Sequence, residues 1–367
     1  MGKRGMGTNQ VLDAVKQIGP TLEGRSAEIE QARGLPPDVV ELIKPTGAFR
    51  MYVPADLDGL GVTAWESLEV IEELAYHDGA AGWCSMIGST TSLTASMLPD
   101  PFANEIFGDV GAIAGGFAMP AGHATPVDGG LRVSGRWQWG SGTRHCTWIA
   151  GGCLVVGEDG TPQARADGLM APFVFFQPDD VEFIDNWDVS GLSGTGSGDY
   201  QVTDVFVPEG RWVELGLDST VRHNSLSRFS FFGLLACGVA SCSMGIARRA
   251  VAELVELAGT KKPQGSSKAL GRRPQVQADV AIAEAKLGSA WAFIEASISD
   301  SWASAESGST PTVEQKRRLR LSATHATQTA AEVAELMYKA AGGAAVYKSC
   351  PLQRLSLIHI SEPTRPY

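Results

Sequence analysis

The chain has 367 residues, 44% of them hydrophobic, which is enough for a buried core and for more than one domain. Its formal net charge of −11 argues against a nucleic-acid-binding protein, for which a basic face is expected. No uninterrupted apolar run reaches the roughly 18 residues that a membrane-spanning helix needs. The six cysteines form no Cys-x-x-Cys pair, so we interpret them as reduced thiols of a cytoplasmic protein.

The first predicted domain, residues 1–110, is helical. It starts with a short polar leader, MGKRGMGTNQ, which has the composition of a disordered segment rather than of a targeting sequence. The part from 9 to 98 shows helical texture. Within it, apolar side chains recur at helical spacing at Leu68, Ile71, Leu74 and Ala75.

The second predicted domain, residues 111–215, has a different texture. Short β-rich runs such as GLRVSGRWQW, TWIAGGCLVV, APFVFFQP and YQVTDVFVP alternate with turns that contain Gly, Asp and Pro. This pattern predicts an all-β segment of short antiparallel strands.

The third predicted domain, residues 216–354, is Ala-rich and helical again. Three long helices are expected over 229–258, 275–305 and 312–341, and the segments between them carry Gly and Pro. Long antiparallel helices joined in this way predict a helical bundle.

The end of the chain, residues 355–367, has the sequence LSLIHISEPTRPY and shares no pattern with what precedes it. It resembles the in-frame translation of an adapter used in DNA sequencing libraries. We therefore expect it to be non-native and the natural chain to continue past Arg354 into a last bundle helix. A recognition tail and an ordinary surface tail are the alternatives; in our interpretation His359 and Arg365 have no role.

Common catalytic and metal-binding motifs are missing from the sequence. The histidines outside the tail form neither His-x-x-x-His nor His-Glu-x-x-His, and no Walker loop or Gly-x-Ser-x-Gly segment is present. We predict no metal site. The Gly-rich stretch SGLSGTGSGDY, residues 190–200, is by itself more typical of a flexible β-turn than of a phosphate loop.

One segment stands out, GRWQWGSG, residues 135–142. Glycine weakens a strand interior unless something must come close to the backbone. An indole offers a flat apolar face, and a serine hydroxyl can both donate and accept a hydrogen bond.

The order of the segments is informative. Helices are followed by a β segment with GRWQWGSG, then by WDVSGLSGTGSGDYQVTDVFVPEGRW, then by a bundle that carries AGGAAVYKSCPLQR. Over residues 11–354 this order resembles the acyl-CoA dehydrogenase superfamily. The resemblance implies an α+β multidomain fold with an N-terminal all-α domain, a middle antiparallel β-barrel and a C-terminal helical bundle whose last helix is missing.

The resemblance also implies a flavin site. Trp139 lies where the family places an indole on the flavin ring, and Ser141 lies where a hydroxyl reaches the flavin N5. Phe117 and Met119 would contact the pyrimidine side of the ring, and Gly140 and Gly142 would let the ring approach the strand. The pair Gly342 and Gly343 matches glycines through which a neighbouring subunit approaches the cofactor. Trp137 is expected to be a core residue.

Two branches of the superfamily differ near this motif. The segment before it, GGFAMPAGHATPVDGGLRVSG, lacks the acidic residues of the dehydrogenases, and GRWQWGSG followed by His145 is closer to the two-component flavin monooxygenases. Their oxygenase components take reduced flavin from a separate reductase and use O2 to hydroxylate a small, often aromatic substrate. Thr90 and Thr91 stand where many relatives carry a histidine.

This resemblance leaves Ser141 and His145 as the predicted catalytic residues, because a histidine can exchange a proton near neutral pH. A histidine at the rim of the β domain is the alternative for His145. Weaker predicted contacts to substrate or phosphate are Thr195, Ser197 and Arg272. For Arg272 a solvated loop position is the favoured interpretation.

We therefore expect a cytoplasmic, flavin-dependent oxidoreductase that works as the oxygenase component of a monooxygenase. Its cofactor would be reduced FMN or FAD without a metal, and its partners a separate flavin reductase and further copies of the chain in a dimer or tetramer. Neither nucleic acid nor a membrane is expected as a partner. The alternatives are an FAD-dependent acyl-CoA dehydrogenase that introduces an α,β double bond, and an inactive family member that serves as a scaffold.

Overall fold

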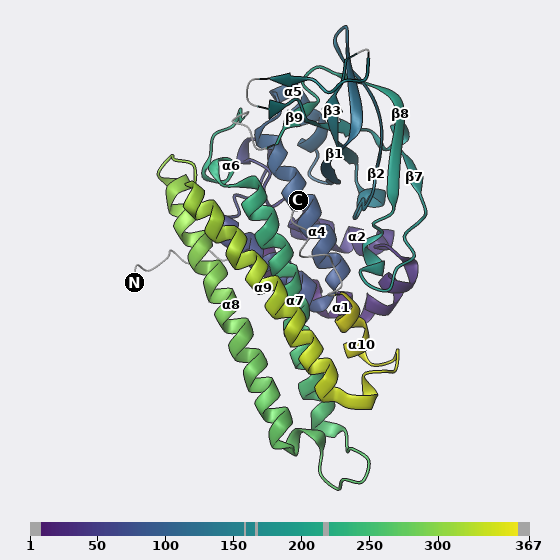
Figure 1. Ribbon diagram of the computed structural model, residues 1–367, viewed down its shortest axis with the longest axis vertical. Helices are drawn as coiled ribbons and strands as arrows, with labels where there is room; N and C mark the ends of the chain where they lie inside the picture. Colours follow the sequence, from purple (N-terminus) through teal and green to yellow (C-terminus); the bar gives the residue numbers. More distant parts are fainter. Residues whose placement is uncertain (1–8, 158, 166–167, 216–219, 359–367) are drawn as a thin grey trace.

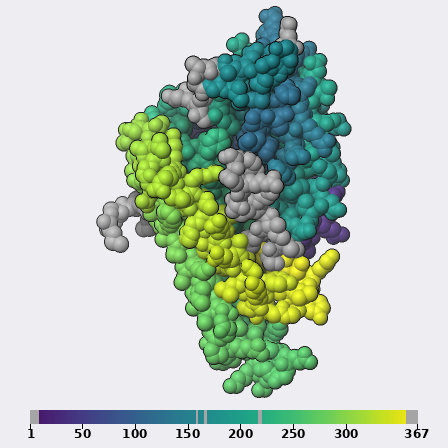
Figure 2. Space-filling model, viewed as in Figure 1, coloured from purple at the N-terminus to yellow at the C-terminus, as the bar shows by residue number. Residues whose placement is uncertain are grey.

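The computed structural model describes residues 9–157, 159–165, 168–215 and 220–358. An N-terminal group of helices, a β-sheet and a C-terminal bundle follow one another along the chain, which confirms the predicted fold class. Figure 1 shows the sheet at one end of an elongated molecule and the long bundle helices running away from it along one side. In the space-filling view the bundle and the β-rich part form two distinct surface regions (Figure 2).

The N-terminal helices are set by clear capping signals. They are α1 (Gln10–Ala32), α2 (Pro37–Ile43), α3 (Ala64–His77), α4 (Gly79–Ser92) and α5 (Asp100–Phe107). Thr63 and Glu66 form a reciprocal capping box at the start of α3. Asp78 both ends α3 and caps α4, where its carboxylate accepts a hydrogen bond from the amide of Ala81. Because this joint is tight, α4 enters the core directly and is buried on nearly all sides.

Seven strands form the main sheet in the order β7-β8-β2-β1-β3-β6-β9. Their bounds are β1 (Ala114–Val127), β2 (Gly130–Trp137), β3 (Trp148–Val155), β6 (Pro172–Phe176), β7 (Glu182–Ile184), β8 (Asp199–Pro208) and β9 (Trp212–Glu214), and β4 (Ala164–Arg165) and β5 (Gly168–Leu169) form a separate pair. Five of the six neighbouring pairs are antiparallel, as predicted, but β1 and β3 are parallel. The difference arises because β2 pairs with one edge of β1 and β3 with the other. The chain must therefore cross the end of the sheet between β2 and β3.

The bundle contains α6 (Ser225–Arg228), α7 (Phe231–Thr260), α8 (Pro274–Glu306), α9 (Val313–Ala341) and α10 (Pro351–Ile358). The three long helices lie where the sequence predicts them. Within the described residues, α7 is the one helix that is long and apolar enough to cross a membrane. The structure places it between α3 and α9, and 72% of its most apolar window is buried, as in the core helix of a bundle.

The predicted start of the foreign tail, Leu355, lies inside α10 and its side chain is buried. His359, Arg365 and the rest of 359–367 lie outside the described residues. That the tail is non-native stays a prediction.

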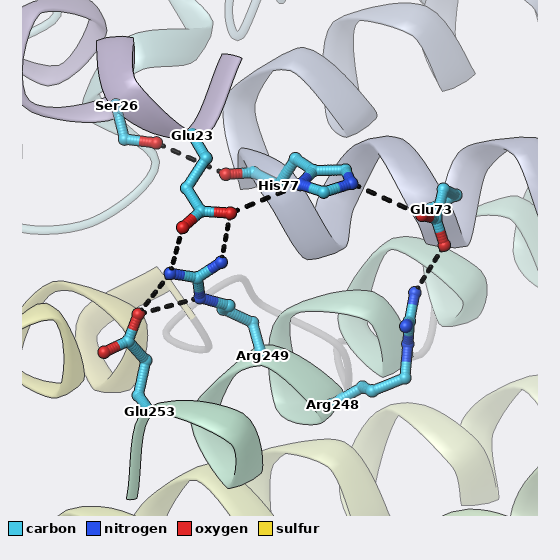
Figure 3. Close-up of polar contacts among 7 residues, drawn as sticks. All are labelled: Glu23, Ser26, Glu73, His77, Arg248, Arg249 and Glu253. Atoms are coloured by element: carbon cyan, nitrogen blue, oxygen red, sulfur yellow. Dashed lines mark hydrogen bonds and ion pairs between the residues drawn. The ribbon is translucent and has the colours of Figure 1, made fainter. Parts of the chain in front are cut away.

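A network of charged side chains joins the N-terminal helices to α7. Figure 3 shows its members, which are Glu23, Glu73, His77, Arg248, Arg249 and Glu253, with Ser26 beside them. The ring of His77 lies 3.4 Å from a Glu23 oxygen and 3.3 Å from a Glu73 oxygen. Hydrogen bonds from His77 and Arg248 lower the pKa of Glu73 to about 2, so this carboxylate stays ionised at any working pH. The network fixes α1 and α3 against α7.

Candidate active site

A cavity of about 1060 Å³ opens where α4, β1, the α6–α7 region and α9 meet. Its size is at the upper end for small-molecule sites in proteins. Most of its wall is apolar or aromatic, including Trp83, Met86, Ile87, Phe117, Met119, Phe229 and Phe231. Thr90 and Thr91 also line it. The cavity can therefore hold a flat apolar ligand together with a second molecule.

The charged residues of this cavity are all cationic. Arg228, Lys316 and Arg320 line it, and no Asp or Glu occurs among its described lining residues. This contrasts with the chain as a whole, whose net charge is −11. Lys316 and Arg320 are four residues apart on α9 and so share one helix face. The local excess of positive charge favours an anionic ligand.

The segment GRWQWGSG, residues 135–142, ends β2 and begins the crossover connection between β2 and β3. The strand β2 ends at Trp137, so Trp139 and Ser141 lie in a turn and not on the strand where we expected them. Trp139 takes a left-handed backbone conformation with φ of 58°. Such strain in a non-glycine residue is typical of functional sites.

Backbone hydrogen bonds dock this turn onto the Gly-rich loop that precedes β8. The amide of Gly140 donates to the carbonyl of Gly198 at 3.0 Å, and the amide of Gly142 donates to the carbonyl of Thr195 at 3.0 Å. The stretch 190–200 is thus the support of the turn and not an independent phosphate loop.

The glycines of the turn have a packing role. A methyl group on Gly140 would lie 2.7 Å from the ring of Tyr200, and one on Gly142 would lie 2.9 Å from the ring of His145. Gly142 also has φ of 69°, which a glycine adopts without strain. Packing within the protein thus accounts for these glycines, and that they also let a flavin approach stays a prediction.

Four polar side chains form a continuous chain of hydrogen bonds behind the cavity wall. The indole Nε1 of Trp83 donates to Ser141 Oγ at 3.0 Å. Ser141 Oγ lies 2.7 Å from Ser197 Oγ, which lies 2.5 Å from Thr195 Oγ1. Thr195 Oγ1 donates to the carbonyl of Leu192 at 2.7 Å. The structure thus brings together three predicted site residues that lie up to 56 positions apart.

Trp83 is a candidate site residue to which the sequence analysis assigned no role. It stands on α4 in the stretch GAAGWCSM and is 58 residues from its hydrogen-bond partner Ser141. It also lines the cavity, so it connects the cavity to the buried hydroxyls. The sequence feature that could have pointed to Trp83 is a tryptophan among small residues. Small neighbours matter because they let α4 approach the turn closely.

An apolar rim borders the same side of the cavity. The indole of Trp139 is 46% exposed and meets the ring of Phe117 edge-on at 5.8 Å between ring centroids. Phe117 and Met119 line the cavity from β1. The amide of Phe117 donates to the hydroxyl of Tyr200 at 2.9 Å, which fixes the bend of β1 at this point. The exposed face of Trp139 is available for stacking.

His145 lies away from this cavity. It ends the short helix η5 (Thr143–His145), its ring centroid is 5.6 Å from that of Phe49, and it is not one of the lining residues. Burial, together with the charge of Lys44, lowers the pKa of His145 to about 4. The imidazole is therefore neutral at pH 7, and its position gives no support to the predicted catalytic role.

This depressed pKa leads to a testable expectation. The unfolded chain binds a proton at His145 near pH 6.5, whereas the folded chain does not bind it until about pH 4. Stability from this residue is therefore complete above pH 6.5 and is lost as the pH falls toward 4, by about 2 kcal/mol between pH 7 and 5. Urea unfolding at both pH values should show a smaller loss in His145→Gln than in the wild type. An equal loss in both proteins would contradict the assignment.

Three predicted residues are distant from the cavity within one chain. Gly342 and Gly343 follow the C-terminal end of α9, whereas Thr327 is the last residue of α9 that lines the cavity. The intervening 15 residues span about 22 Å of helix. Arg272 is exposed in η8 (Leu270–Arg272), beyond the end of α7. Contacts of these residues with a flavin remain predictions that require a second copy of the chain.

The part of the chain that the structure describes contains no group of three or more His, Cys, Asp or Glu side chains that could hold a metal ion.

Two family models match the chain. The acyl-CoA dehydrogenase N-terminal domain matches residues 11–101, and the acyl-CoA dehydrogenase C-terminal domain matches residues 237–356.

Curated relatives cover most of the chain. It is 32% identical over 346 residues to indole-3-acetate monooxygenase of Pseudomonas putida, an alignment that covers 94% of this chain and 85% of the relative. It is 28% identical to the flavin-dependent monooxygenase oxygenase subunit HsaA of Rhodococcus jostii, over 94% of this chain and 90% of the relative.

Solved structures agree with these relatives. The 3-HSA hydroxylase from Rhodococcus sp. RHA1 superposes with a TM-score of 0.86 at 25% identity, covering 95% of this chain and 90% of the other. XiaF from a Streptomyces species, solved in complex with FADH2 and glycerol, has the same fold with a TM-score of 0.86 at 23% identity, covering 95% and 89%.

Proposed function

The chain belongs to the acyl-CoA dehydrogenase family, on the side of its flavin-dependent monooxygenases, and from this premise we propose that it is the oxygenase component of a two-component monooxygenase. It is a flavin-dependent oxidoreductase that hydroxylates a small aromatic substrate with reduced flavin and O2. The observation that carries this function is the buried chain Trp83–Ser141–Ser197–Thr195, which ends beside the large cavity.

The residues that are present fit a flavin. Trp139, Phe117 and Met119 offer an apolar rim for a planar ring, and Ser141 offers a buried oxygen beside it. When bound, reduced flavin supplies the electrons that activate O2 for transfer of one oxygen atom to the substrate. The part of this chain is to stack on the ring through Trp139, to hold its N5 edge through Ser141, and to exclude water with the apolar wall.

The curated relatives favour the monooxygenase over the dehydrogenase alternative, for which the described cavity offers no base. Removing a proton from the α-carbon of an acyl-CoA requires a general base, which in this chemistry is a carboxylate. The described lining residues contain no Asp or Glu. Oxygen transfer from a reduced flavin to an electron-rich aromatic ring has no such requirement.

The function is tested by supplying reduced FMN or FAD from a separate flavin reductase with NADH and O2. We expect hydroxylation of an aromatic substrate that depends on both the reductase and this chain. If an acyl-CoA instead bleached the bound flavin under anaerobic conditions without a reductase, the dehydrogenase alternative would replace our proposal.

We further propose that the substrate is an aromatic carboxylate. The apolar and aromatic wall suits a ring, and Arg228, Lys316 and Arg320 supply cations with no acidic residue among the described lining. The name of the Pseudomonas putida relative, indole-3-acetate monooxygenase, identifies a substrate of this class for that protein.

A pair of ligands that differ only in charge tests this substrate class. Indole-3-acetate should bind about five- to tenfold more tightly than indole-3-acetamide, because the three cations that line the cavity together contribute about 1 to 1.4 kcal/mol. In Arg320→Gln and Arg228→Gln the ratio should approach one, whereas Arg317→Gln should preserve it, because Arg317 pairs with Glu314 outside the cavity. Calorimetric titration of each protein gives the affinities. Equal binding of both ligands by the wild type would rule out the carboxylate.

We also propose that the protein forms a homo-oligomer and works in the cytoplasm. Gly342 and Gly343 are exposed and about 22 Å from the cavity along α9, which supports a homo-oligomer in which one copy completes the flavin site of another. All six cysteines are free thiols and five are buried, which supports a reducing compartment such as the cytoplasm.

A further inference from the structure

We propose that Tyr200 is a positioning residue that sets the spacing between Phe117 and Trp139, the aromatic rim of the cavity. Tyr200 is not one of the described residues that line the cavity, so it acts from behind the wall. Its hydroxyl holds β1 at Phe117, and its ring supports the turn that carries Trp139. The inference rests on the proposed function, because it concerns the rim to which we assign the flavin.

The strand β1 is irregular where it borders the cavity. Its register with β3 is regular up to Phe117 and shifts before Pro120, so Ala118 and Met119 are extra residues of a bulge. Both of these residues line the cavity, and Met119 is 46% exposed. Bulges re-aim side chains and are frequent next to active sites. The shape of this wall therefore depends on how β1 is held where the bulge begins.

The hydroxyl of Tyr200 holds β1 at exactly this point of the strand. It accepts a hydrogen bond from the amide of Phe117 at 2.9 Å and donates one to the carbonyl of Ala150 on β3 at 2.6 Å. Because Tyr200 stands on β8, these two bonds tie β1 and β3 to a third strand. Burial raises the pKa of the Tyr200 hydroxyl, so it stays protonated and keeps both bonds at any working pH.

The ring of Tyr200 supports the other half of the rim. It is fully buried and stacks on Trp137 with an angle of 18° between the ring planes. A methyl group on Gly140 would lie 2.7 Å from this ring, so the turn packs directly on it. Trp139 immediately precedes Gly140, and its indole meets Phe117 edge-on. One buried side chain thus contacts the backbone on both sides of the aromatic rim.

Removing the hydroxyl alone should change the rim from one side. Tyr200→Phe leaves the buried amide of Phe117 and the buried carbonyl of Ala150 without their shared partner, and unsatisfied buried polar groups are costly. The strand β1 should then move toward β3, where the two groups can bond each other. The turn with Trp139 should stay in place, because the ring that supports it is kept. The spacing of the rim changes although no residue that lines the cavity has been replaced.

The test compares Tyr200→Phe with Tyr52→Phe as a matched control. Tyr52 is also fully buried, and its hydroxyl donates to Ser67 at 2.7 Å within the N-terminal helical domain, away from the described cavity lining. Urea unfolding should show a loss of stability in both variants. Anaerobic titration should show that Tyr200→Phe binds reduced FMN about three- to tenfold more weakly than the wild type, whereas Tyr52→Phe stays within about twofold.

Two further measurements separate positioning from simple structural damage. In a Phe117→Ala background the effect of Tyr200→Phe on affinity should shrink to about twofold or less, because the ring that it positions is absent. Its effect on the free energy of unfolding should persist there, because the hydroxyl bonds the backbone of Phe117 and not its ring. At saturating oxidised FMN, Tyr200→Phe should quench the flavin fluorescence less than the wild type, because the flavin no longer fits closely against the indole of Trp139. Tyr52→Phe should quench it as the wild type does.

The outcomes distinguish this inference from the proposed function. Equal affinities in Tyr200→Phe and the wild type, or a loss that persists in full in the Phe117→Ala background, would overturn the positioning role while leaving a flavin enzyme. If Tyr200→Phe did not fold, a ring-fluorinated tyrosine at this position would replace it, because fluorine weakens the hydroxyl as an acceptor and should weaken FMN binding in the same direction; unchanged binding would again overturn the role. A wild type that binds FMN in neither redox state would overturn the proposed function and this inference with it.

Discussion

Trp139→Ala is expected to weaken the binding of reduced FMN by about 10- to 100-fold and to leave the free energy of unfolding nearly unchanged. The loss corresponds to about 1.5–3 kcal/mol, the cost of losing a large aromatic contact with a planar ligand. Stability should not change because the indole is 46% exposed and makes one ring contact, to Phe117. Fluorescence titration under anaerobic conditions measures the affinity, and urea unfolding measures the stability.

Two substitutions make this expectation specific. Trp139→Phe keeps an aromatic face and should recover most of the affinity. Met119→Ala, on the opposite part of the rim, removes a flexible apolar contact and should cost less than Trp139→Ala. If Trp139→Ala and the wild type bound reduced FMN equally, the flavin would not lie on this indole, and the turn after β2 would lose its proposed role.

Local sequence patterns predict the helices of this protein well. The sequence predicts a helix over 312–341 and the structure has α9 at Val313–Ala341, because Thr312 and Gln315 form a capping box and a glycine ends the helix. The prediction of a helix over 229–258 agrees with α7 to within two residues at each end. Such signals lie within a few residues of one another, so they can be read without knowing the fold.

The parts that sequence could not predict depend on distant contacts. The parallel pairing of β1 with β3 depends on which edge of β1 the strand β2 occupies, and no local pattern encodes this choice. The contact of Trp83 with Ser141 joins residues 58 positions apart on different elements. His145 fits a motif by its position, yet packing beside Phe49 places it away from the cavity. The motif points to the turn after β2 as a candidate site, but only the fold shows which of its side chains are buried and which are exposed.

Glycines near this turn also have a packing role in the core. The indole of Trp137 occupies a slot that three glycines, one each on β1, β2 and β3, leave free. A methyl group on Gly122 or Gly151 would lie 2.5 Å from this ring, and one on Gly135 would lie 2.9 Å from it. The glycines before the turn therefore make room for the core tryptophan, whereas the neighbouring Trp139 stays exposed and free for the proposed flavin.

This slot makes Trp137→Ala the most destabilising substitution that we expect, at about 3–5 kcal/mol of unfolding free energy. The indole is fully buried, stacks on Tyr200 with 5.3 Å between ring centroids, and donates from Nε1 to the carbonyl of Gly152 at 2.7 Å. The surrounding cavity cannot collapse, because glycines have no side chains with which to fill it and the strands are held by their ladders. Urea unfolding followed by circular dichroism measures the loss.

A reciprocal substitution shows whether the slot itself is responsible. Gly151→Ala places a methyl group against the ring and should cost about 1–3 kcal/mol in the wild type through overpacking. In a Trp137→Leu background the ring is absent, so the same methyl group fills space and the cost should vanish or change sign. Additive losses in the double variant would mean that Gly151 is required for strand geometry and not for the indole. A non-additive result would show that Trp137 and Gly151 are energetically coupled as one packing unit, which holds the end of β2 and thereby the turn that carries Trp139 and Ser141.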